Sequence, residues 1–203
     1  MWFLKLALKR FFDILLSAGA LIALSPVLLL LSLGVVLDSG FPILFAQIRV
    51  GRNFRRFHLW KIRSMRCSVS GPLVTISGDP RVTRFGRWMR ANKLDELPQF
   101  WNVVRGDMSL VGPRPEVPEY VERFRQRYER ILAARPGVTD LASIRFCNEE
   151  QLLAASEEPH REYVERVLPI KLDLADEYLQ TACFSRDISI LVQTALVMFR
   201  KHL

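Results

Sequence analysis

One apolar segment near the start of this chain restricts what the whole chain can fold into. Residues 14–37 form a run of 24 amino acids without a charged side chain. As a straight helix the run would be roughly 36 Å long, and the hydrocarbon layer of a bilayer is about 30 Å thick. A run of this length and composition is typical of membrane proteins, so we expect it to enter a bilayer.

Several membrane arrangements could accommodate this run. A cleaved signal peptide has an apolar region of about 7–15 residues, whereas this run continues well beyond its small residues Ala18-Gly19-Ala20. A straight span conflicts with the flanking charges, because basic residues lie on both sides and each side therefore favours the cytoplasm. Ser25-Pro26 in the middle interrupts helical hydrogen bonding. We therefore favour a re-entrant helix–break–helix hairpin, with limbs of about 18–20 Å, over a kinked span.

The net charge is concentrated beside the apolar run. The chain carries +8 in total, residues 1–66 carry all of this excess, and residues 67–203 contain 19 basic and 19 acidic side chains. An excess in this position suits anionic lipid headgroups, so we expect no nucleic-acid partner. The three cysteines are widely spaced and form no metal-binding motif, which favours a reducing, cytosolic setting. We divide the chain into a membrane hairpin, residues 1–40, and a cytosolic membrane-associated domain, residues 41–203.

Beyond the apolar run, local patterns predict an α+β domain that is mostly helical. Two β-patterned runs, 43–50 and 54–62, are separated by the turn residues Gly51-Arg52-Asn53, which predicts a small β-hairpin with a three-residue connection. Alternation along the second run puts Lys61 and Arg63 on one face, so we expect these two cations to project together.

Helical patterns account for most of the remaining chain. The expected helices cover 83–94 with Thr83 as N-cap, 118–134, 154–178 with interruptions near Pro159 and Pro169, and 188–199, while 67–80 is expected to be a loop. The last helix is about 18 Å long, too short to span a bilayer, so it packs in the domain or lies at the interface.

The pair Asp95-Glu96 is the best candidate for chemistry. Adjacent side chains on a regular helix diverge by about 100°, but Pro98 disfavours helical geometry at Leu97 and marks a boundary where both carboxylates can be aimed independently. Arginines at three-residue spacing precede the pair, and the proline-flanked Arg114 follows it. This combination suits a phosphorylated substrate with a divalent metal between acid and phosphate. An ordinary ion-pair network would have the same spacing.

Short motifs then follow one another in order from residue 9 to about residue 198. They are Lys9-Arg10, Asp13, Ser25-Pro26, residues 61–65 (KIRSM), 79–81 (DPR), 86–90 (GRWMR), 94–99 (LDELPQ), Asn102-Val103, 106–109 (GDMS) and 111–115 (VGPRP). Together they resemble the bacterial sugar transferases, which are monotopic polyprenyl-phosphate phosphoglycosyl transferases. The length of the chain is similar to the minimal catalytic unit of that family, so residues 41–203 would be its catalytic domain.

The resemblance implies a reaction and a mechanism. A sugar 1-phosphate would pass from a UDP-sugar to undecaprenyl phosphate, with release of UMP, as the first membrane step of exopolysaccharide or other glycoconjugate biosynthesis. Asp95 would be the nucleophile of a ping-pong mechanism through an aspartyl-phosphosugar intermediate. An aspartate near its ordinary pKa of about 3.9 is already ionised at neutral pH and needs no base. Mg²⁺ held by Asp95 and Glu96 would be the cofactor.

The resemblance also assigns the surrounding residues. Arg90 matches the phosphate-contacting arginine of the family, Arg114 is expected at the nucleotide end, and Lys61 and Arg63 are expected as further phosphate contacts. It supports the re-entrant hairpin, broken at Ser25-Pro26, on the cytoplasmic face of the bacterial inner membrane. Further expected partners are anionic lipids, a second copy of the chain and downstream glycosyltransferases.

Two positions depart from the family pattern, and one alternative function stays open. Asp140 stands where the family often has glycine, and Ser64 stands where threonine is common. The alternative is a catalytically idle membrane scaffold of the same fold. The intact Asp95-Glu96 pair and Arg90 argue against it, because a scaffold has no need of them.

Overall fold

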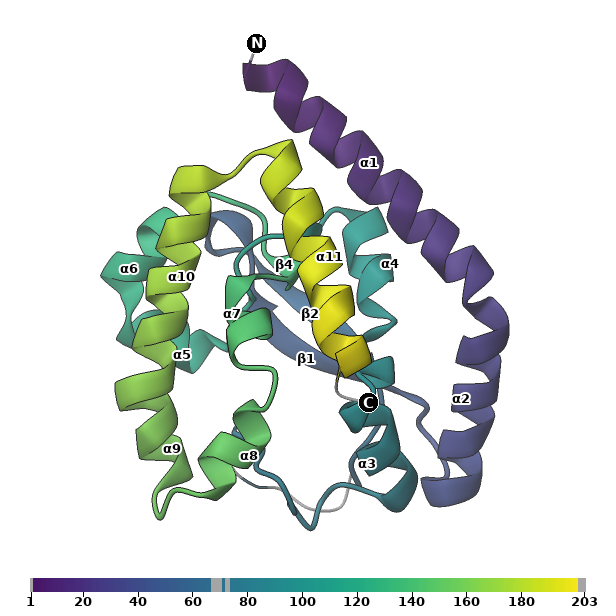
Figure 1. The fold of residues 1–203 in the computed structure, drawn as a ribbon. Coiled ribbons are helices and arrows are strands. Elements are labelled where there is room, and N and C mark those ends of the chain that lie inside the picture. The colour runs from purple at the N-terminus through teal and green to yellow at the C-terminus, as the bar shows by residue number, and fades with distance from the viewer. Residues whose placement is uncertain (1, 67–70, 72–73, 201–203) are drawn as a thin grey trace.

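The computed structural model describes residues 2–66, 71 and 74–200, and this part of the chain is mostly helical with two small β-pairs (Figure 1). The helices are α1 (Trp2–Ala23), α2 (Ser25–Ser39), α3 (Arg84–Ala91), α4 (Gln99–Arg105), α5 (Pro118–Arg123), α6 (Arg125–Ile131), α7 (Leu141–Arg145), α8 (Glu149–Ala154), α9 (Pro159–Glu162), α10 (Leu168–Thr181) and α11 (Phe184–Arg200). Short turns of other helical types are η1 (Arg52–Phe54), η2 (Leu94–Glu96) and η3 (Tyr163–Val167). The mostly helical content and the β-hairpin confirm the predicted fold class at this level.

The β-hairpin lies at the predicted place with a longer connection. Strands β1 (Leu44–Val50) and β2 (Arg56–Ile62) pair antiparallel over their whole length. The connection has five residues instead of three, because Asn53 and Phe54 adopt positive φ angles of 54° and 60° and turn the chain before β2 begins. The local twist at these residues therefore delays the second strand.

A second β-pair was not predicted. Strands β3 (Ser109–Val111) and β4 (Gly137–Thr139) pair in parallel, and three residues are too few to reveal a period of two in the sequence. Glycine is required where the two backbones meet, because a Cβ added at Gly137 would lie 2.2 Å from the nitrogen and 2.3 Å from the oxygen of Gly112. The pair brings the segment after β3 close to the start of α7.

The apolar run is bent at the predicted position. The stretch Ala7–Ala23 and helix α2 meet at 59°, and the hydroxyl of Ser25 donates to the Ile22 carbonyl at 2.7 Å. In the described part of the chain, no single helix combines the length and the apolar character needed to cross a bilayer. The bent pair meets these two requirements only when both helices are counted together.

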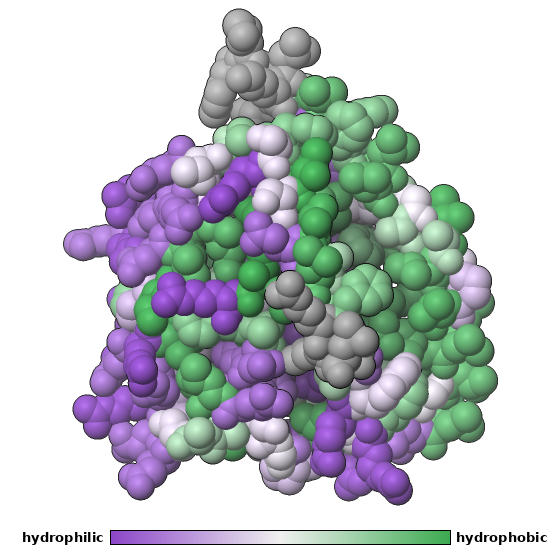
Figure 2. Space-filling view, viewed as in Figure 1, coloured by the Kyte–Doolittle hydropathy of each residue, from purple (hydrophilic) through white to green (hydrophobic). Residues whose placement is uncertain are grey.

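Exposed apolar side chains gather over the bent pair. Figure 2 shows hydrophobic residues along α1 and α2 and a stripe over α11, whereas the side of α9 and α10 is mainly hydrophilic. Leu29, Leu30 and Leu37 of α2 expose 72, 69 and 78% of their surface. This arrangement is the reverse of a soluble helix, which turns its leucines inward.

The opposite face of α2 packs against the domain. Leu31 of α2, Ile62 of β2 and Met89 of α3 form one buried cluster. Leu94 and Leu97, on either side of the Asp95-Glu96 pair, pack against this cluster. The flanks of the acidic pair are therefore packed against a cluster that includes α2, the second helix of the bent apolar pair.

Several helix boundaries differ from the prediction. The helix after Thr83 ends at Ala91 instead of 94, and the predicted helix 118–134 is divided at Phe124 into α5 and α6. The predicted helix 154–178 begins only at Pro159, because Ala154 is the last residue of the preceding helix α8. It also contains the π-turn η3. The C-terminal helix is longer than predicted and covers Phe184–Arg200. The predicted loop 67–80 lies partly outside the described residues.

Candidate active site

The acidic pair lies in a turn between two helices. Thr83 caps α3 as predicted, with its hydroxyl oxygen accepting from the Gly86 nitrogen at 2.9 Å. Lys93 then adopts a left-handed conformation with φ of 56°, which costs a non-glycine residue about 1–2 kcal/mol. The chain is redirected there, so the two neighbouring carboxylates of η2 can point to different partners.

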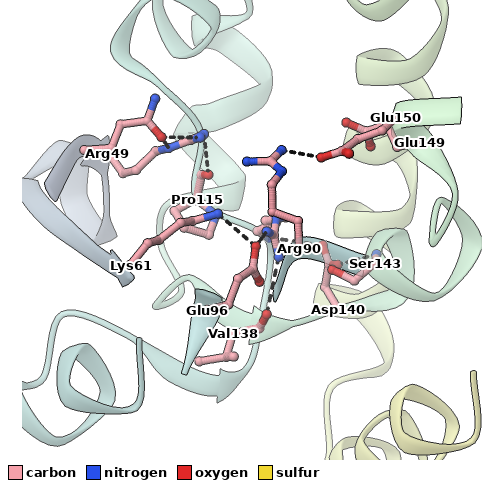
Figure 3. A network of polar contacts seen from close by, with 12 residues as sticks. Arg49, Lys61, Arg90, Glu96, Pro115, Val138, Asp140, Ser143, Glu149 and Glu150 are labelled. Carbon is pink, nitrogen blue, oxygen red and sulfur yellow. Dashed lines mark hydrogen bonds and ion pairs between the residues drawn. The ribbon is translucent and has the colours of Figure 1, made fainter. Parts of the chain in front are cut away.

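Glu96 is held by two cations. One carboxylate oxygen, Oε1, lies 2.9 Å from Lys61 Nζ and 2.6 Å from Arg114 Nη2 (Figure 3). Burial on its own would raise the pKa of Glu96, but the charges of Arg114 and Lys61 outweigh burial and hold this pKa well below its usual range. Glu96 is therefore a permanent anion that orients both cations.

Asp95 differs from its neighbour. Its side chain is 3% exposed, and among the described residues its carboxylate takes part in no hydrogen bond or ion pair. Burial raises the pKa of Asp95, the charge of Lys61 opposes this rise, and the charge of Glu96 adds to it. The pKa of Asp95 is therefore raised above the ordinary aspartate value, because the carboxylate is desolvated and lacks the direct pairing of Glu96.

Lys61 and Arg114 approach Glu96 from distant parts of the chain. Burial lowers the pKa of Lys61, although the charge of Glu96 opposes the change, while the same charge raises the pKa of Arg114. The Arg114 backbone nitrogen donates to Asp140 at 3.1 Å. Arg49 fixes the next turn residue by donating to the Pro115 carbonyl at 3.0 Å. The proline-flanked turn thus presents Arg114 as the sequence predicts.

Asp140 is a site residue whose role the sequence analysis missed. Its side chain caps α7 by accepting from the Ser143 nitrogen at 2.7 Å, and it also accepts from the Arg114 backbone. An aspartate just before a short helix is a known N-cap signal and could have predicted the first contact. The second contact depends on the β3–β4 pairing. The aspartate at position 140 therefore makes two contacts, to α7 and to the Arg114 backbone, that a glycine could not make.

Arg90 reaches the site from α3. Its guanidinium is ion-paired with Glu150 of α8, as Figure 3 shows, and its charge lowers the pKa of Asp95. The structure therefore brings Arg90, Asp95, Glu96, Lys61 and Arg114 together, and we call these five residues the catalytic cluster.

Arg63 does not join this cluster. It is 5% exposed and donates to the backbone carbonyls of residues 39–41 at 2.6–2.9 Å. The expectation that Lys61 and Arg63 project together is wrong, because β2 ends at Ile62 and the alternation of side chains ends with it. Arg63 instead binds the carbonyls at the end of α2 and just beyond it. Ser64 is also internal, and its carbonyl accepts from the Thr83 nitrogen at 3.1 Å.

Comparison with known protein families gives a match over almost the whole chain. The family model for bacterial sugar transferase matches residues 4–201. The chain belongs to the bacterial sugar transferase family. This bacterial sugar transferase is 44% identical over 155 residues to the exopolysaccharide production protein PSS of Rhizobium leguminosarum bv. phaseoli, a match that covers 70% of this chain and 76% of that protein.

Two further relatives carry names that state a reaction. The UDP-glucose:undecaprenyl-phosphate glucose-1-phosphate transferase of Caulobacter vibrioides is 38% identical over 199 residues, covering 92% of this chain and 67% of that protein. The protein of the same name from Escherichia coli is 42% identical over 142 residues, covering 68% of this chain and 31% of that protein. The bacterial sugar transferase described here therefore spans about a third of the longer relative.

Two residues of α1 bind the segment between Glu96 and Arg114 in this sugar transferase. The Arg10 guanidinium donates to three carbonyls at and just beyond the end of α4, at 2.7–3.2 Å. Asp13, buried, accepts from the Ser109 hydroxyl at 2.7 Å and from the Leu110 nitrogen at 3.3 Å. The sequence analysis placed Arg10 and Asp13 among the family motifs but did not predict these contacts.

Lys9 extends the same contact to α11. Its ammonium lies 2.5 Å from a carboxylate oxygen of Asp187 and donates to the Val111 carbonyl at 3.2 Å. The Tyr178 hydroxyl donates to the other Asp187 oxygen at 2.7 Å. We refer below to a docking cluster, which consists of Lys9, Arg10, Asp13, Tyr178 and Asp187.

The carboxylates of the catalytic cluster fit the expected magnesium ion. Mg²⁺ is usually held by one or two carboxylates together with substrate phosphates, not by a cage made only of protein groups. Among the described residues, no group of three or more His, Cys, Asp or Glu side chains could hold a metal ion. Within the same part of the chain, neither oxygen of Asp95 has a hydrogen-bond or ion-pair partner, whereas Oε1 of Glu96 is already bound by two cations.

Proposed function

We propose that this bacterial sugar transferase moves a sugar 1-phosphate from a UDP-sugar to undecaprenyl phosphate and releases UMP. The names of the Caulobacter and Escherichia relatives support this reaction. The observation that carries the proposal is the contrast within the acidic pair. Asp95 is buried and has no hydrogen-bond or ion-pair partner in the part of the chain that the structure describes, and it lies next to a glutamate that holds two cations in place.

Asp95 would act as the nucleophile. One carboxylate oxygen attacks the sugar-bearing phosphorus, the bond between this phosphorus and the bridging oxygen breaks, and UMP leaves with that oxygen and its electron pair. The product is an aspartyl phosphosugar. An oxygen of undecaprenyl phosphate then attacks the same phosphorus and expels the Asp95 carboxylate, which gives the polyprenyl diphosphate sugar and completes a ping-pong cycle.

The cations of the cluster reduce the repulsion between these anions. A carboxylate and a diphosphate are both negative, so catalysis depends mainly on positioning and on charge stabilisation. Arg90 lies within electrostatic range of Asp95, and Lys61 and Arg114 are held on one oxygen of Glu96. Glu96 therefore acts by positioning Lys61 and Arg114 for the phosphates.

Magnesium belongs to this proposal as the expected cofactor. Asp95 would hold it together with the phosphates, and Glu96 would contribute its second oxygen. When bound, the ion neutralises charge on the diphosphate and stabilises the departing UMP.

The membrane arrangement we propose is a re-entrant hairpin at the cytoplasmic face of the inner membrane. Both ends of the apolar run are bound to the same domain: Arg10 to the end of α4, and the residues after α2 to Arg63. A straight span would separate these two ends by the thickness of the bilayer, about 30 Å. The bend of 59° and the exposed leucines of α2 support the same arrangement.

Release of UMP tests the reaction directly. The detergent-solubilised protein is incubated with magnesium, undecaprenyl phosphate and a panel containing UDP-glucose, UDP-galactose and UDP-N-acetylgalactosamine. We expect UMP release with at least one donor. Without undecaprenyl phosphate, a ping-pong enzyme should release UMP in a burst close to one equivalent, and mass spectrometry should find a phosphosugar on the peptide that contains Asp95.

The controls distinguish the alternatives. Asp95→Asn should abolish both the burst and the adduct. A folded protein that releases no UMP with any donor would favour the idle scaffold, and steady turnover without a burst would contradict the covalent intermediate.

A further inference from the structure

Arg90 has a different kind of partner from the other cations of the catalytic cluster. Lys61 and Arg114 share Glu96, which belongs to the acidic pair. Arg90 pairs instead with Glu150 at the start of α8, sixty positions further along the chain. A carboxylate from outside the acidic pair therefore occupies the guanidinium whose charge acts on Asp95.

The Arg90–Glu150 pair is also the most accessible of these ion pairs. The side chain of Glu150 is 41% exposed, compared with 14% for Glu96. Ion pairs that are open to solvent contribute little free energy, and phosphate is a stronger arginine ligand than a single carboxylate because it offers more charge and more oxygens. A diphosphate that enters the site would therefore exchange for Glu150 more easily than for Glu96.

Only the side chain of Glu150 has to move for this exchange. Its backbone carbonyl accepts from the Ser77 nitrogen at 2.9 Å, and the neighbouring Glu149 is held by Lys171 at 2.5 Å. The guanidinium of Arg90 can also donate a further hydrogen bond, because its buried Nε has no hydrogen-bond partner among the described residues.

We propose that the Glu150 carboxylate competes with the diphosphate of the donor for binding to Arg90. In the absence of a ligand its carboxylate occupies Arg90, the diphosphate of the donor displaces it, and it returns to Arg90 when UMP leaves. Glu150 would thus weaken donor and UMP binding and assist product release. This inference rests on the proposed function, since it takes the donor to be a nucleoside diphosphate sugar.

Binding of UDP to the full-length protein tests the competition. UDP is titrated by calorimetry, with magnesium, into the unchanged protein, Glu150→Gln and Glu150→Asp. Because an exposed ion pair of this kind is worth about 0.2–1 kcal/mol, Glu150→Gln should bind UDP about 1.4- to 5-fold more tightly. Glu150→Asp keeps the charge but shortens the reach, so it should also bind more tightly.

Glu158→Gln is the matched control. Glu158 lies in the same acidic stretch, 66% exposed and paired with Arg161 at 3.2 Å, and the substitution makes the same change of net charge. We expect no change in UDP affinity for this variant. In the UMP-release assay, Glu150→Gln should lower KM for the donor and strengthen inhibition by added UMP.

The other possible results distinguish failure of the Glu150 competition from failure of the proposed reaction. Unchanged or weaker UDP binding by Glu150→Gln would overturn the competition, as would an equal gain in Glu158→Gln or wild-type affinity in Glu150→Asp. Failure of the unchanged protein to bind UDP would overturn the donor class and the competition together. Tighter UDP binding by Glu150→Gln, combined with no turnover of any donor, would contradict the proposed reaction alone.

Discussion

The catalytic cluster and the docking cluster contain similar side chains but differ in how their charges are partnered. In the docking cluster Lys9, Arg10 and Asp13 each bind fixed groups of the protein. In the catalytic cluster Glu96 is bound in the same way, but Asp95 has no partner in the described part of the chain. An unpartnered buried carboxylate lowers stability, so its presence marks the place where a ligand supplies the missing contacts.

The two clusters are also physically connected. The docking cluster binds the end of α4 and strand β3, and these elements lie between Glu96 and Arg114 along the chain. Helix α1, the first helix of the bent apolar pair, thus supports the backbone that carries the site. The two clusters use different side chains, but both are attached to the same stretch of backbone between Glu96 and Arg114.

Replacing the unpartnered carboxylate should have the largest effect on activity. Asp95→Asn should lower UMP release by more than about a thousandfold, because the variant lacks the nucleophile. The folded-state pKa of Asp95 is raised, so its charge destabilises the protein at neutral pH, and the variant should melt at the same or a higher temperature. Measurements of activity and of thermal unfolding in one detergent check both statements. A large loss of Tm would mean that Asp95 is a structural residue like Glu96.

Replacing the partnered carboxylate, Glu96, should reduce both stability and activity. Glu96→Gln leaves Lys61 and Arg114 without their shared anion, so we expect a loss of about 3 kcal/mol in the free energy of unfolding. Misplacement of the two cations should lower kcat/KM roughly 100-fold. Full stability in Glu96→Gln would show that the two cations do not depend on this anion.

The pH dependence of stability provides an independent check on Glu96. Its folded-state pKa lies well below the ordinary value of 4.5, so its contribution is fully present above pH 4.5 and is lost as the pH falls toward the folded value. The difference in unfolding free energy between the unchanged protein and Glu96→Gln should therefore shrink on acidification below about pH 4.5. Denaturant titrations at a series of pH values measure this difference in unfolding free energy. A difference that does not change with pH would contradict a lowered pKa for Glu96.

The docking cluster should affect stability more than chemistry. Asp187→Asn removes the ion pair with Lys9 but leaves an acceptor for Tyr178, so we expect a loss of about 1–2 kcal/mol. UMP release should change less than about threefold when assayed well below Tm. An activity loss as large as that of Glu96→Gln would remove the distinction between the two clusters.

The smallest effect is expected at the departure from the family pattern. Asp140→Gly removes the α7 cap and the acceptor of the Arg114 nitrogen, which should cost less than about 1 kcal/mol. Because only the position of Arg114 is loosened, KM for the donor should rise about twofold with kcat unchanged. Asp140→Asn keeps only one of the two acceptor oxygens, so its effect should be smaller than that of Asp140→Gly but not absent. Equal effects of the two variants would mean that the charge of Asp140 matters instead of its contacts.

Strong local signals predicted much of this molecule. The bend at Ser25-Pro26, the β-hairpin and the Thr83 cap each depend on neighbouring residues, and all lie where the sequence places them. Errors arose where local signals were weak or short. The pair β3–β4 is too brief for a pattern, and Arg63 was assigned a strand position one residue beyond the end of β2.

The sequence by itself determined the bend in the apolar run, the family and the identity of the acidic pair, because a long uncharged run, a proline break and ordered motifs can all be recognised from the order of the residues. Only the tertiary structure distinguished Asp95 from Glu96. Their difference depends on Lys61 and Arg114, which lie 35 and 18 positions away from Glu96 along the chain. Charges so far apart meet only after β2 and the turn beyond β3 have packed around η2, so the roles of two adjacent carboxylates are decided by the fold.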